Sequence, residues 1–236
     1  MFPIRDDQPR YTTPVVNYFI IALNIFVYLF LEVPAQLQGN RAFDVLVFQF
    51  GLIPQHVTRA LGGSHQDALP AALLTILTSM FMHGGLLHIV GNLWSLWIFG
   101  DNIEDYLGHF SYLIFYLVCG FAAAFADIAI SPASRLPTIG ASGAIAGVMG
   151  AYILLYPRAR VLTLVVLVIF FTFWWLPAWI FLGYWFLLNF VATSVVASGA
   201  QQTGGVAFAA HVGGFIAGMV LIKLLPERTR SYRYGG

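Results

Sequence analysis

The chain has 236 residues, of which 59% are hydrophobic, 16% aromatic and only 9% charged. Soluble domains carry about 25% charged residues, so a soluble fold of this size would lack the polar surface that it needs. We therefore expect a protein that is embedded in a lipid bilayer. The net charge of +1 gives no reason to expect a nucleic-acid partner. The single cysteine, Cys119, excludes an intramolecular disulfide and a cysteine-based metal cluster.

Six apolar segments are predicted to cross the membrane as helices, because a bilayer core about 30 Å thick needs about 20 apolar helical residues. The expected spans are residues 14–31, 86–100, 106–126, 142–156, 177–197 and 206–225. They form one membrane domain at 14–225, after a short cytoplasmic N-terminal segment at 1–13 and before a basic cytoplasmic tail at 226–236. The predicted fold class is an all-α polytopic membrane protein, a six-transmembrane-helix bundle.

The segments between these spans are expected to lie in water or at the membrane surface. Residues 32–70 are mixed in polarity and predict a long external loop that lies partly in the interface, followed by residues 71–82 at or just inside the outer surface. Three acidic residues are expected to end the second span in water: Asp101, Glu104 and Asp105. Asp127 ends the third span, and 198–205 form the turn before the sixth. The uncharged stretch 161–176 is either an apolar connector at the interface or a seventh span.

The distribution of basic residues favours six spans over seven. With the N-terminus inside, most Lys and Arg residues are cytoplasmic, and only Arg41, Arg59 and Arg135 are external. This asymmetry follows the positive-inside rule, whereas a seventh span would place the basic tail outside. We expect a multi-pass protein of a bacterial plasma (inner) membrane, with both termini in the cytoplasm.

Ser142 stands between glycines, in Gly140-Ala141-Ser142-Gly143, at the start of the fourth span. Taken alone, a serine among glycines in a membrane helix most often serves helix packing. His211 lies about five residues into the sixth predicted span. With six spans both segments run from outside to inside, so a rise of about 1.5 Å per residue places the two side chains within about 10 Å in depth. Seven spans would place them at opposite faces of the membrane.

The residues that share a helix face with each of these side chains are small: Ala146 and Gly150 with Ser142, Gly214 and Gly218 with His211. Small faces let membrane helices approach closely, and a hydroxyl and an imidazole share a proton only at about 2.6–3.2 Å. Neither span holds an Asp or Glu that could orient the imidazole. We therefore predict a Ser-His dyad, with Ser142 as the nucleophile and His211 as its base.

A third motif, His83-Gly-Gly-Leu-Leu-His88-Ile-Val-Gly-Asn92, precedes and begins the second span. His88 and Asn92 are four residues apart, on one helix face and at the depth of Ser142. Their side chains and the backbone N–H of Ser142 can donate hydrogen bonds to an oxyanion. His83 is expected to hold the loop over the site. A zinc site of His83, His88 and His211 is an alternative, which the absence of Asp and Glu from these spans disfavours.

Together these motifs resemble those of the rhomboid intramembrane serine proteases. The resemblance rests on the HxxxxHxxxN pattern that ends at Asn92, on the segment 140–143, and on Ala210-His211-Val212-Gly213-Gly214. It covers most of the chain, from about Leu52 to Leu225. Some members of that family carry a tyrosine four residues after the serine, stacked on the base. Here Ala146 occupies that position, so another group must hold His211.

The resemblance implies a fold, a reaction and a class of substrate. The fold is a six-helix, rhomboid-like bundle with a water-filled cavity open to the outside. Ser142 is the nucleophile and His211 the base, while His88 and Asn92 belong to the oxyanion hole. The substrates are single-span membrane proteins, cut in or near the span without a metal or another cofactor. Three glycines are expected to support this site by leaving room for the sixth span and for a peptide backbone: Gly140, Gly143 and Gly214.

Two functions of other classes stay open at this point. One is a non-catalytic, rhomboid-like membrane-protein binding protein or chaperone. The other is a small transporter with a histidine relay. The lipid bilayer is an expected partner in every case.

Overall fold

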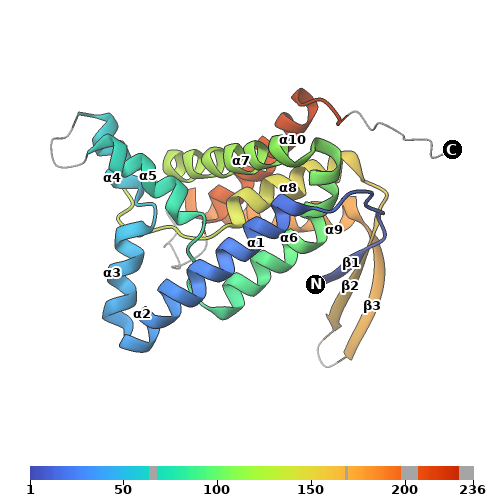
Figure 1. Ribbon diagram of the computed structural model, residues 1–236, viewed down its shortest axis with the longest axis horizontal. Helices are drawn as coiled ribbons and strands as arrows, with labels where there is room; N and C mark the ends of the chain where they lie inside the picture. The colour runs from blue at the N-terminus through green and yellow to red at the C-terminus, as the bar shows by residue number, and fades with distance from the viewer. Residues whose placement is uncertain (64–67, 168–169, 198–206, 229–236) are drawn as a thin grey trace.

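The computed structural model describes residues 1–63, 68–167, 170–197 and 207–228, and most of them lie in helices (Figure 1). The helices are α1 (Val15–Val27), the π-helix η1 (Tyr28–Glu32), α2 (Val33–Gln38), α3 (Asn40–Phe50), α4 (Pro54–Leu61), α5 (Leu69–Ser79), α6 (Leu86–Leu107), α7 (His109–Ile130), α8 (Ser142–Leu155), α9 (Ala178–Ala197) and α10 (Phe208–Leu224). The strands are β1 (Phe2–Asp6), β2 (Arg160–Leu167) and β3 (Phe170–Pro177).

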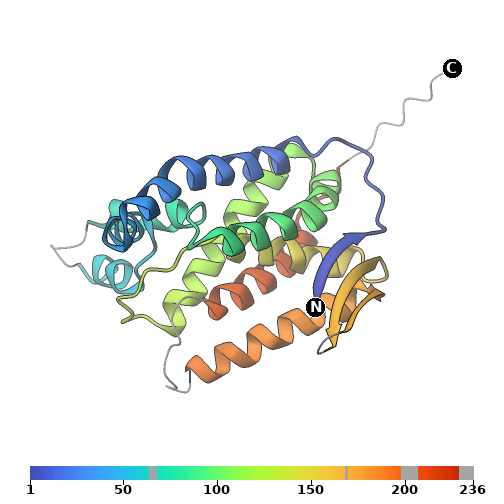
Figure 2. The ribbon, with the colours of Figure 1, turned by 90° about the horizontal axis from the view of Figure 1, so that it is seen from below.

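Helix α8 lies at the centre of the bundle and is buried from Gly143 to Tyr152. It packs against α6, α7, α9 and α10, which agrees with its apolar residues on every side. Helix α9 lies at the edge of the bundle, alongside α10 (Figure 2). The central helix therefore presents its first residue, Ser142, to a space that the surrounding helices enclose.

Helices α8 and α10 approach each other so closely that glycine is needed at their contact. A Cβ at Gly214 would collide with the carbonyl oxygen of Gly143, and one at Gly218 with that of Gly147. The predicted close approach of these two helices is confirmed, and small residues permit it as in other membrane helix pairs. The contacting face of α8 includes Ser142 and Gly150 of the predicted face, because Ser142 meets His211 and a Cβ at Gly150 would collide with the carbonyl oxygen of Phe215. It also includes Gly143 and Gly147, which were predicted to lie outside it.

Among the described residues, three helical stretches are long and apolar enough to cross a membrane: Val15–Gln38, His109–Ile130 and Ala178–Ala197. Shorter apolar helices lie at Leu69–Ser79, Ser142–Leu155 and Phe208–Leu224. A helix occupies the position of each predicted span, so a polytopic helical membrane protein agrees with the structure. The count of six crossings stays a prediction.

A three-stranded sheet corrects the prediction of an all-α fold. Strand β2 pairs antiparallel with both β1 and β3, in the order β1-β2-β3, at the end of the bundle opposite α3 and α4 (Figure 1). Residues 161–167 and 170–176 thus lie in paired strands, and the alternative of a seventh helical span here is wrong. Alternate residues of β2, Val161, Thr163 and Val165, are buried, and β-branched residues at that spacing favour a strand.

The N-terminal segment is folded against the bundle. Besides the pairing of β1 with β2, the hydroxyl of Tyr152 on α8 donates to the carboxylate of Asp6. The indole N–H of Trp94 on α6 donates to the carbonyl oxygen of Pro3 over 2.6 Å. The guanidinium of Arg160 contacts the carboxylate of Asp7 at 2.7 Å. Residues 1–13 therefore tie the sheet to two helices of the bundle.

Glu104 and Asp105 at the end of α6 are buried and Asp101 is half-buried, which corrects the expectation that all three lie in water. The carboxylate of Glu104 accepts hydrogen bonds from the backbone N–H groups of Val16 and Asn17 at 2.9 and 2.6 Å. That of Asp105 accepts from the hydroxyl of Thr12 at 2.6 Å. The two bonds to Glu104 satisfy N–H groups that have no intrahelical acceptor at the start of α1, where a negative charge is also favourable. Helix α6 consequently continues to Leu107, past the predicted end of the span.

Other boundaries also differ from those predicted. The described part of 32–70 is mostly helical, and Glu32 is wholly buried. Most of the predicted segment 71–82 lies in α5, whose residues Ala72 and Ile76 are buried against α7. Asp127 lies inside α7 and accepts a hydrogen bond from Thr138 at 2.9 Å. The predicted turn at 198–205 and residues 229–236 of the tail lie outside the described residues.

Candidate active site

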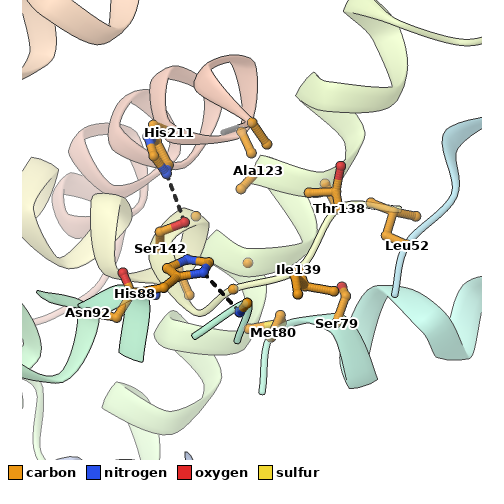
Figure 3. Close-up of a pocket in the computed structure, with 18 of the residues that line it drawn as sticks. Leu52, Ser79, Met80, His88, Asn92, Ala123, Thr138, Ile139, Ser142 and His211 are labelled. Carbon is orange, nitrogen blue, oxygen red and sulfur yellow. Dashed lines mark hydrogen bonds between the residues drawn. The ribbon is translucent and has the colours of Figure 1, made fainter. Parts of the chain in front are cut away.

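Ser142 and His211 lie next to each other at the predicted site. The hydroxyl oxygen Oγ of Ser142 is 2.8 Å from the Nε2 nitrogen of His211 (Figure 3). Ser142 is the first residue of α8, and His211 lies in the first turn of α10. The close glycine contact between these helices sets this separation, which is within the range that a serine and a general base need to share a proton.

Both side chains line a cavity of about 560 Å³. Its walls come from several helices and from the loop before α8, and they are mostly apolar. The polar side chains that converge in it include those of Ser142, His211, His88 and Asn92. Figure 3 shows His88 and Asn92 below Ser142, with His211 above it. A largely apolar cavity with a few convergent polar groups is typical of a binding or catalytic site.

His88 directs a ring N–H toward the serine. Its Nδ1 nitrogen accepts a hydrogen bond from the backbone N–H of Gly84 at 3.2 Å, so the neutral ring carries its proton on Nε2. A Cβ placed on Gly140 would be 2.8 Å from that Nε2 and 3.5 Å from the Ser142 hydroxyl. The Nε2–H group of His88 therefore points into the space beside Ser142.

Asn92 and the start of α8 supply two further donors. The amide nitrogen Nδ2 of Asn92 is buried and has no hydrogen-bond partner among the described residues, although leaving such a donor unpaired costs about 1–3 kcal/mol. The backbone N–H of Ser142 lies in the first helical turn, where no intrahelical acceptor exists. With His88, these groups are arranged so that they can bind the oxyanion of an acyl-transfer reaction.

His83 packs beside His88 and is not among the residues that line the cavity. Its ring is fully buried and packs edge-on against that of His88, with 5.2 Å between ring centroids. Its backbone N–H donates to the carboxylate of Glu32 over 2.7 Å. His83 is thus placed to support His88. Within the described ranges, no three His, Cys, Asp or Glu side chains are grouped so that they could hold a metal ion.

Gly140 adopts a backbone conformation that L-residues rarely take, with φ = 131°. Its N–H donates to the carbonyl oxygen of Ser79 over 2.9 Å, which ties the loop before α8 to the end of α5. Gly143 and Gly214 meet at the contact of α8 with α10. At all three predicted supporting glycines a Cβ would collide with a neighbouring atom, so each position needs glycine.

Two residues of α9 contact His211, and sequence reasoning missed both. The Nδ1 nitrogen of His211 is 2.7 Å from the amide oxygen Oδ1 of Asn189. The ring of Trp185 packs on the imidazole with 5.5 Å between centroids, in place of the aromatic group that Ala146 lacks. The sequence did contain a signal for Asn189, because it is the one Asn, Gln or charged residue in 177–197. Polar groups in membrane spans are costly, so such a residue indicates a role.

Comparisons with known proteins agree with these motifs. The family model for the Rhomboid domain matches residues 70–228. The chain is 28% identical over 167 residues to Rhomboid protein 1, mitochondrial, of Saccharomyces cerevisiae, covering 68% of this chain and 45% of that protein. It is 30% identical over 139 residues to Rhomboid protease GluP of Bacillus subtilis, covering 58% and 24%. It is 34% identical over 143 residues to Presenilin-associated rhomboid-like protein A, mitochondrial, of Danio rerio, covering 60% and 32%.

The matches cover less than half the length of each of these relatives. They include mitochondrial proteins as well as a bacterial one, so the comparisons do not support the predicted bacterial inner membrane. The match to the Rhomboid domain includes every residue of the candidate site.

Proposed function

Because the chain belongs to the rhomboid family, we propose that it is an intramembrane serine endopeptidase that uses Ser142 and His211. Its apolar helices and its family make it an integral membrane protein. The observation that carries the proposal is the 2.8 Å contact between the Ser142 hydroxyl and the His211 imidazole. A relative named a protease, GluP, supports the same reaction class.

The reaction begins when His211 Nε2 takes the hydroxyl proton of Ser142, while Oγ attacks the carbonyl carbon of the scissile peptide bond. The negative charge that develops on the carbonyl oxygen is stabilised by N–H groups of His88, Asn92 and Ser142. Collapse of this intermediate breaks the C–N bond, and His211 returns the proton to the leaving nitrogen. The chain is then held as an ester on Ser142.

Water completes the cycle. His211 takes a proton from a water molecule, whose oxygen attacks the ester carbonyl, and the same donors stabilise the second oxyanion. The ester C–O bond then breaks, and His211 returns its proton to Ser142. These steps use only side chains, backbone N–H groups and water.

The proposed substrates are single-span membrane proteins, cut in or near the span. The cavity lies among apolar helices, where a membrane segment arrives without crossing water. Because backbone groups of a helix are already hydrogen-bonded to each other, the substrate must unwind locally before Ser142 reaches a carbonyl. The proposed topology keeps six spans in 14–225, with 1–13 and 226–236 on the cytoplasmic side.

Purified protein in lipid vesicles, incubated with a model single-span substrate, tests the proposal. Wild type is expected to give defined fragments, and Ser142→Ala to lower the rate about 10⁴-fold or more. A fluorophosphonate probe is expected to label wild type and not Ser142→Ala. If neither protein cuts, or if both give the same fragments, the protease function is wrong. Equal substrate binding by both without cleavage would instead indicate a non-catalytic binding protein.

A further inference from the structure

We propose that Asn189 is the positioning residue of the general base, so that the dyad is the reactive part of a Ser-His-Asn hydrogen-bond chain. This inference rests on the proposed protease function. It assigns a role to α9, from which none of the three sequence motifs of the site comes. Asn189 is 7% exposed, and its amide lies on the side of the imidazole away from Ser142.

The backbone of α9 fixes which way the Asn189 amide points. Its nitrogen Nδ2 donates to the backbone carbonyl oxygen of Trp185 over 2.8 Å. A carbonyl oxygen only accepts hydrogen bonds, so the amide cannot be turned around without losing this bond. The amide oxygen Oδ1 must therefore face His211.

That orientation in turn selects the proton position on His211. An amide oxygen only accepts, so the Nδ1 nitrogen at 2.7 Å must carry the proton. A neutral imidazole has one N–H, and Nε2 is left with its lone pair. Nε2 is the nitrogen 2.8 Å from the Ser142 hydroxyl, and a general base needs a lone pair there. The bond from Asn189 thus selects the tautomer that the reaction requires.

Helix α9 also restrains the plane of the imidazole. The Trp185 ring lies 5.5 Å from the His211 ring at an angle of 36°, one turn from Asn189. His211 is therefore held at its edge by an amide and at its face by an indole, both from the same helix. Rotation of the ring away from Ser142 would break the hydrogen bond and the ring contact together.

A neutral amide suits this position better than a carboxylate. In the described residues, the other titratable groups that face the ring are His88 on α6 and Ser142 on α8, and no carboxylate does so from α7, α9 or α10. Asp at position 189 would add a charge inside a membrane span, which is costly. It would also stabilise the imidazolium relative to the neutral base.

The test compares Asn189→Leu and Asn189→Asp in the vesicle cleavage assay over a range of pH. Asn189→Leu is expected to lower kcat about 10- to 100-fold with little change in KM, because the ring loses its orientation. Asn189→Asp is expected to move the acid limb of the pH–rate profile upward by about one pH unit or more. A residue that only supports folding would lower the folded fraction without moving that limb.

Thr193→Val is the matched control, since its hydroxyl donates to the backbone carbonyl of Asn189 on the same helix over 2.8 Å and makes no contact with the imidazole. It is expected to keep the wild-type pH profile. A wild-type kcat and acid limb in both Asn189 variants would overturn the proposal. If Asn189→Leu does not fold, the nearly isosteric Asn189→Asp decides through its pH profile.

A readout that is independent of cleavage separates failure of this proposal from failure of the protease function. Nitrogen-15 NMR of labelled histidine in micelles reports which ring nitrogen carries the proton. Wild-type His211 is expected to be protonated on Nδ1, and Asn189→Leu to show a mixture of tautomers. Protonation of His211 on Nε2 in the neutral wild-type protein would overturn the proposal, whether or not the protein is a protease.

Discussion

At the scale of single residues, two histidines face the cavity and the group at each Nδ1 gives them opposite roles. His88 accepts at Nδ1 from the Gly84 N–H and so presents an N–H at Nε2. His211 meets the Asn189 oxygen at Nδ1 and so presents a lone pair at Nε2. One side-chain type can thus present a donor at one position and an acceptor at the other, which fits the proposed roles of oxyanion donor and base.

Gly140→Ala tests the placement of His88. At φ = 131° an alanine is strained, and its Cβ would lie 2.8 Å from His88 Nε2. We expect a loss of stability of about 1–3 kcal/mol and a fall in kcat of about 10²-fold, because one oxyanion donor is displaced. Thermal unfolding and cleavage kinetics of the purified variant measure the two effects.

Gly91→Ala is the control for this change, because a Cβ there meets no atom within 4 Å. It is expected to keep both the activity and the melting temperature of the wild type. A normal kcat in a destabilised Gly140→Ala protein would show that the reaction does not depend on the position of His88.

At the scale of elements, the contact between α8 and α10 sets the distance between Ser142 and His211, the proposed nucleophile and base. Gly214→Ala would place a Cβ against the carbonyl oxygen of Gly143, and backbone cannot yield as a flexible side chain can. We expect the helices to move apart, with a stability loss of about 1–3 kcal/mol or more. Fluorophosphonate labelling of Ser142 should slow, since the bond from His211 lengthens.

Gly183→Ala on α9 is the matched control, because a Cβ there also meets nothing within 4 Å. Labelling rate and melting temperature are expected to stay at wild-type values. Unchanged labelling in a folded Gly214→Ala protein would mean that the two helices do not need this spacing for reactivity.

The elements also show what the sequence could and could not predict. Motif spacing and topology together predicted that Ser142 and His211 meet. Both the depth of each side chain in the membrane and the small residues on each helix face can be read from short stretches of sequence. The hairpin at 160–177 was missed because apolar residues lie on both of its faces. Phe171 and Phe173 are exposed, whereas Val161 is buried. A strand without a polar face lacks the alternation of apolar and polar residues by which a strand is recognised in a sequence.

Contacts between segments that are far apart in the sequence could not be predicted from local sequence patterns. Nothing in the sequence near Glu104 says that it will bind the start of α1, 87 residues away. Likewise, the turn of α9 that directs Asn189 at His211 depends on how two helices pack, which periodicity alone leaves open. The sequence therefore predicted that Ser142 and His211 meet and missed the contact of Asn189 with His211.

At the scale of the whole molecule, α8 connects the cavity to the sheet. Ser142 begins this helix at the cavity, and Tyr152, near the helix's other end, binds Asp6 of β1. The pKa values of two adjacent carboxylates in this N-terminal segment shift in opposite directions. Burial raises the pKa of Asp6 from 3.8 to about 6, against the hydrogen bond from Tyr152. Burial acts to raise the pKa of Asp7 too, but bonds from Arg160 outweigh it and lower that pKa.

The two shifts predict opposite pH dependences for the docking of β1. The folded pKa of Asp6 exceeds its unfolded value, so its contribution to stability is full below about pH 3.8 and is lost as pH rises through about 6. Asp7 contributes above pH 3.8 and loses its contribution as pH falls through its lowered folded pKa. Between pH 4 and 7, Asp6 dominates, so hydrogen-exchange protection of Phe2–Asp6 should fall as pH rises, after correction for intrinsic exchange.

Asp6→Asn separates this effect from other titrations. Asparagine still accepts from Tyr152 but carries no charge, so we expect stronger protection of β1 at pH 7 and no fall between pH 4 and 7. Asp7→Asn is expected to weaken protection at pH 7, because it removes the charge that pairs with Arg160 at 2.7 Å. If the fall with pH persists in Asp6→Asn, a carboxylate other than Asp6 controls the docking of the N-terminal strand.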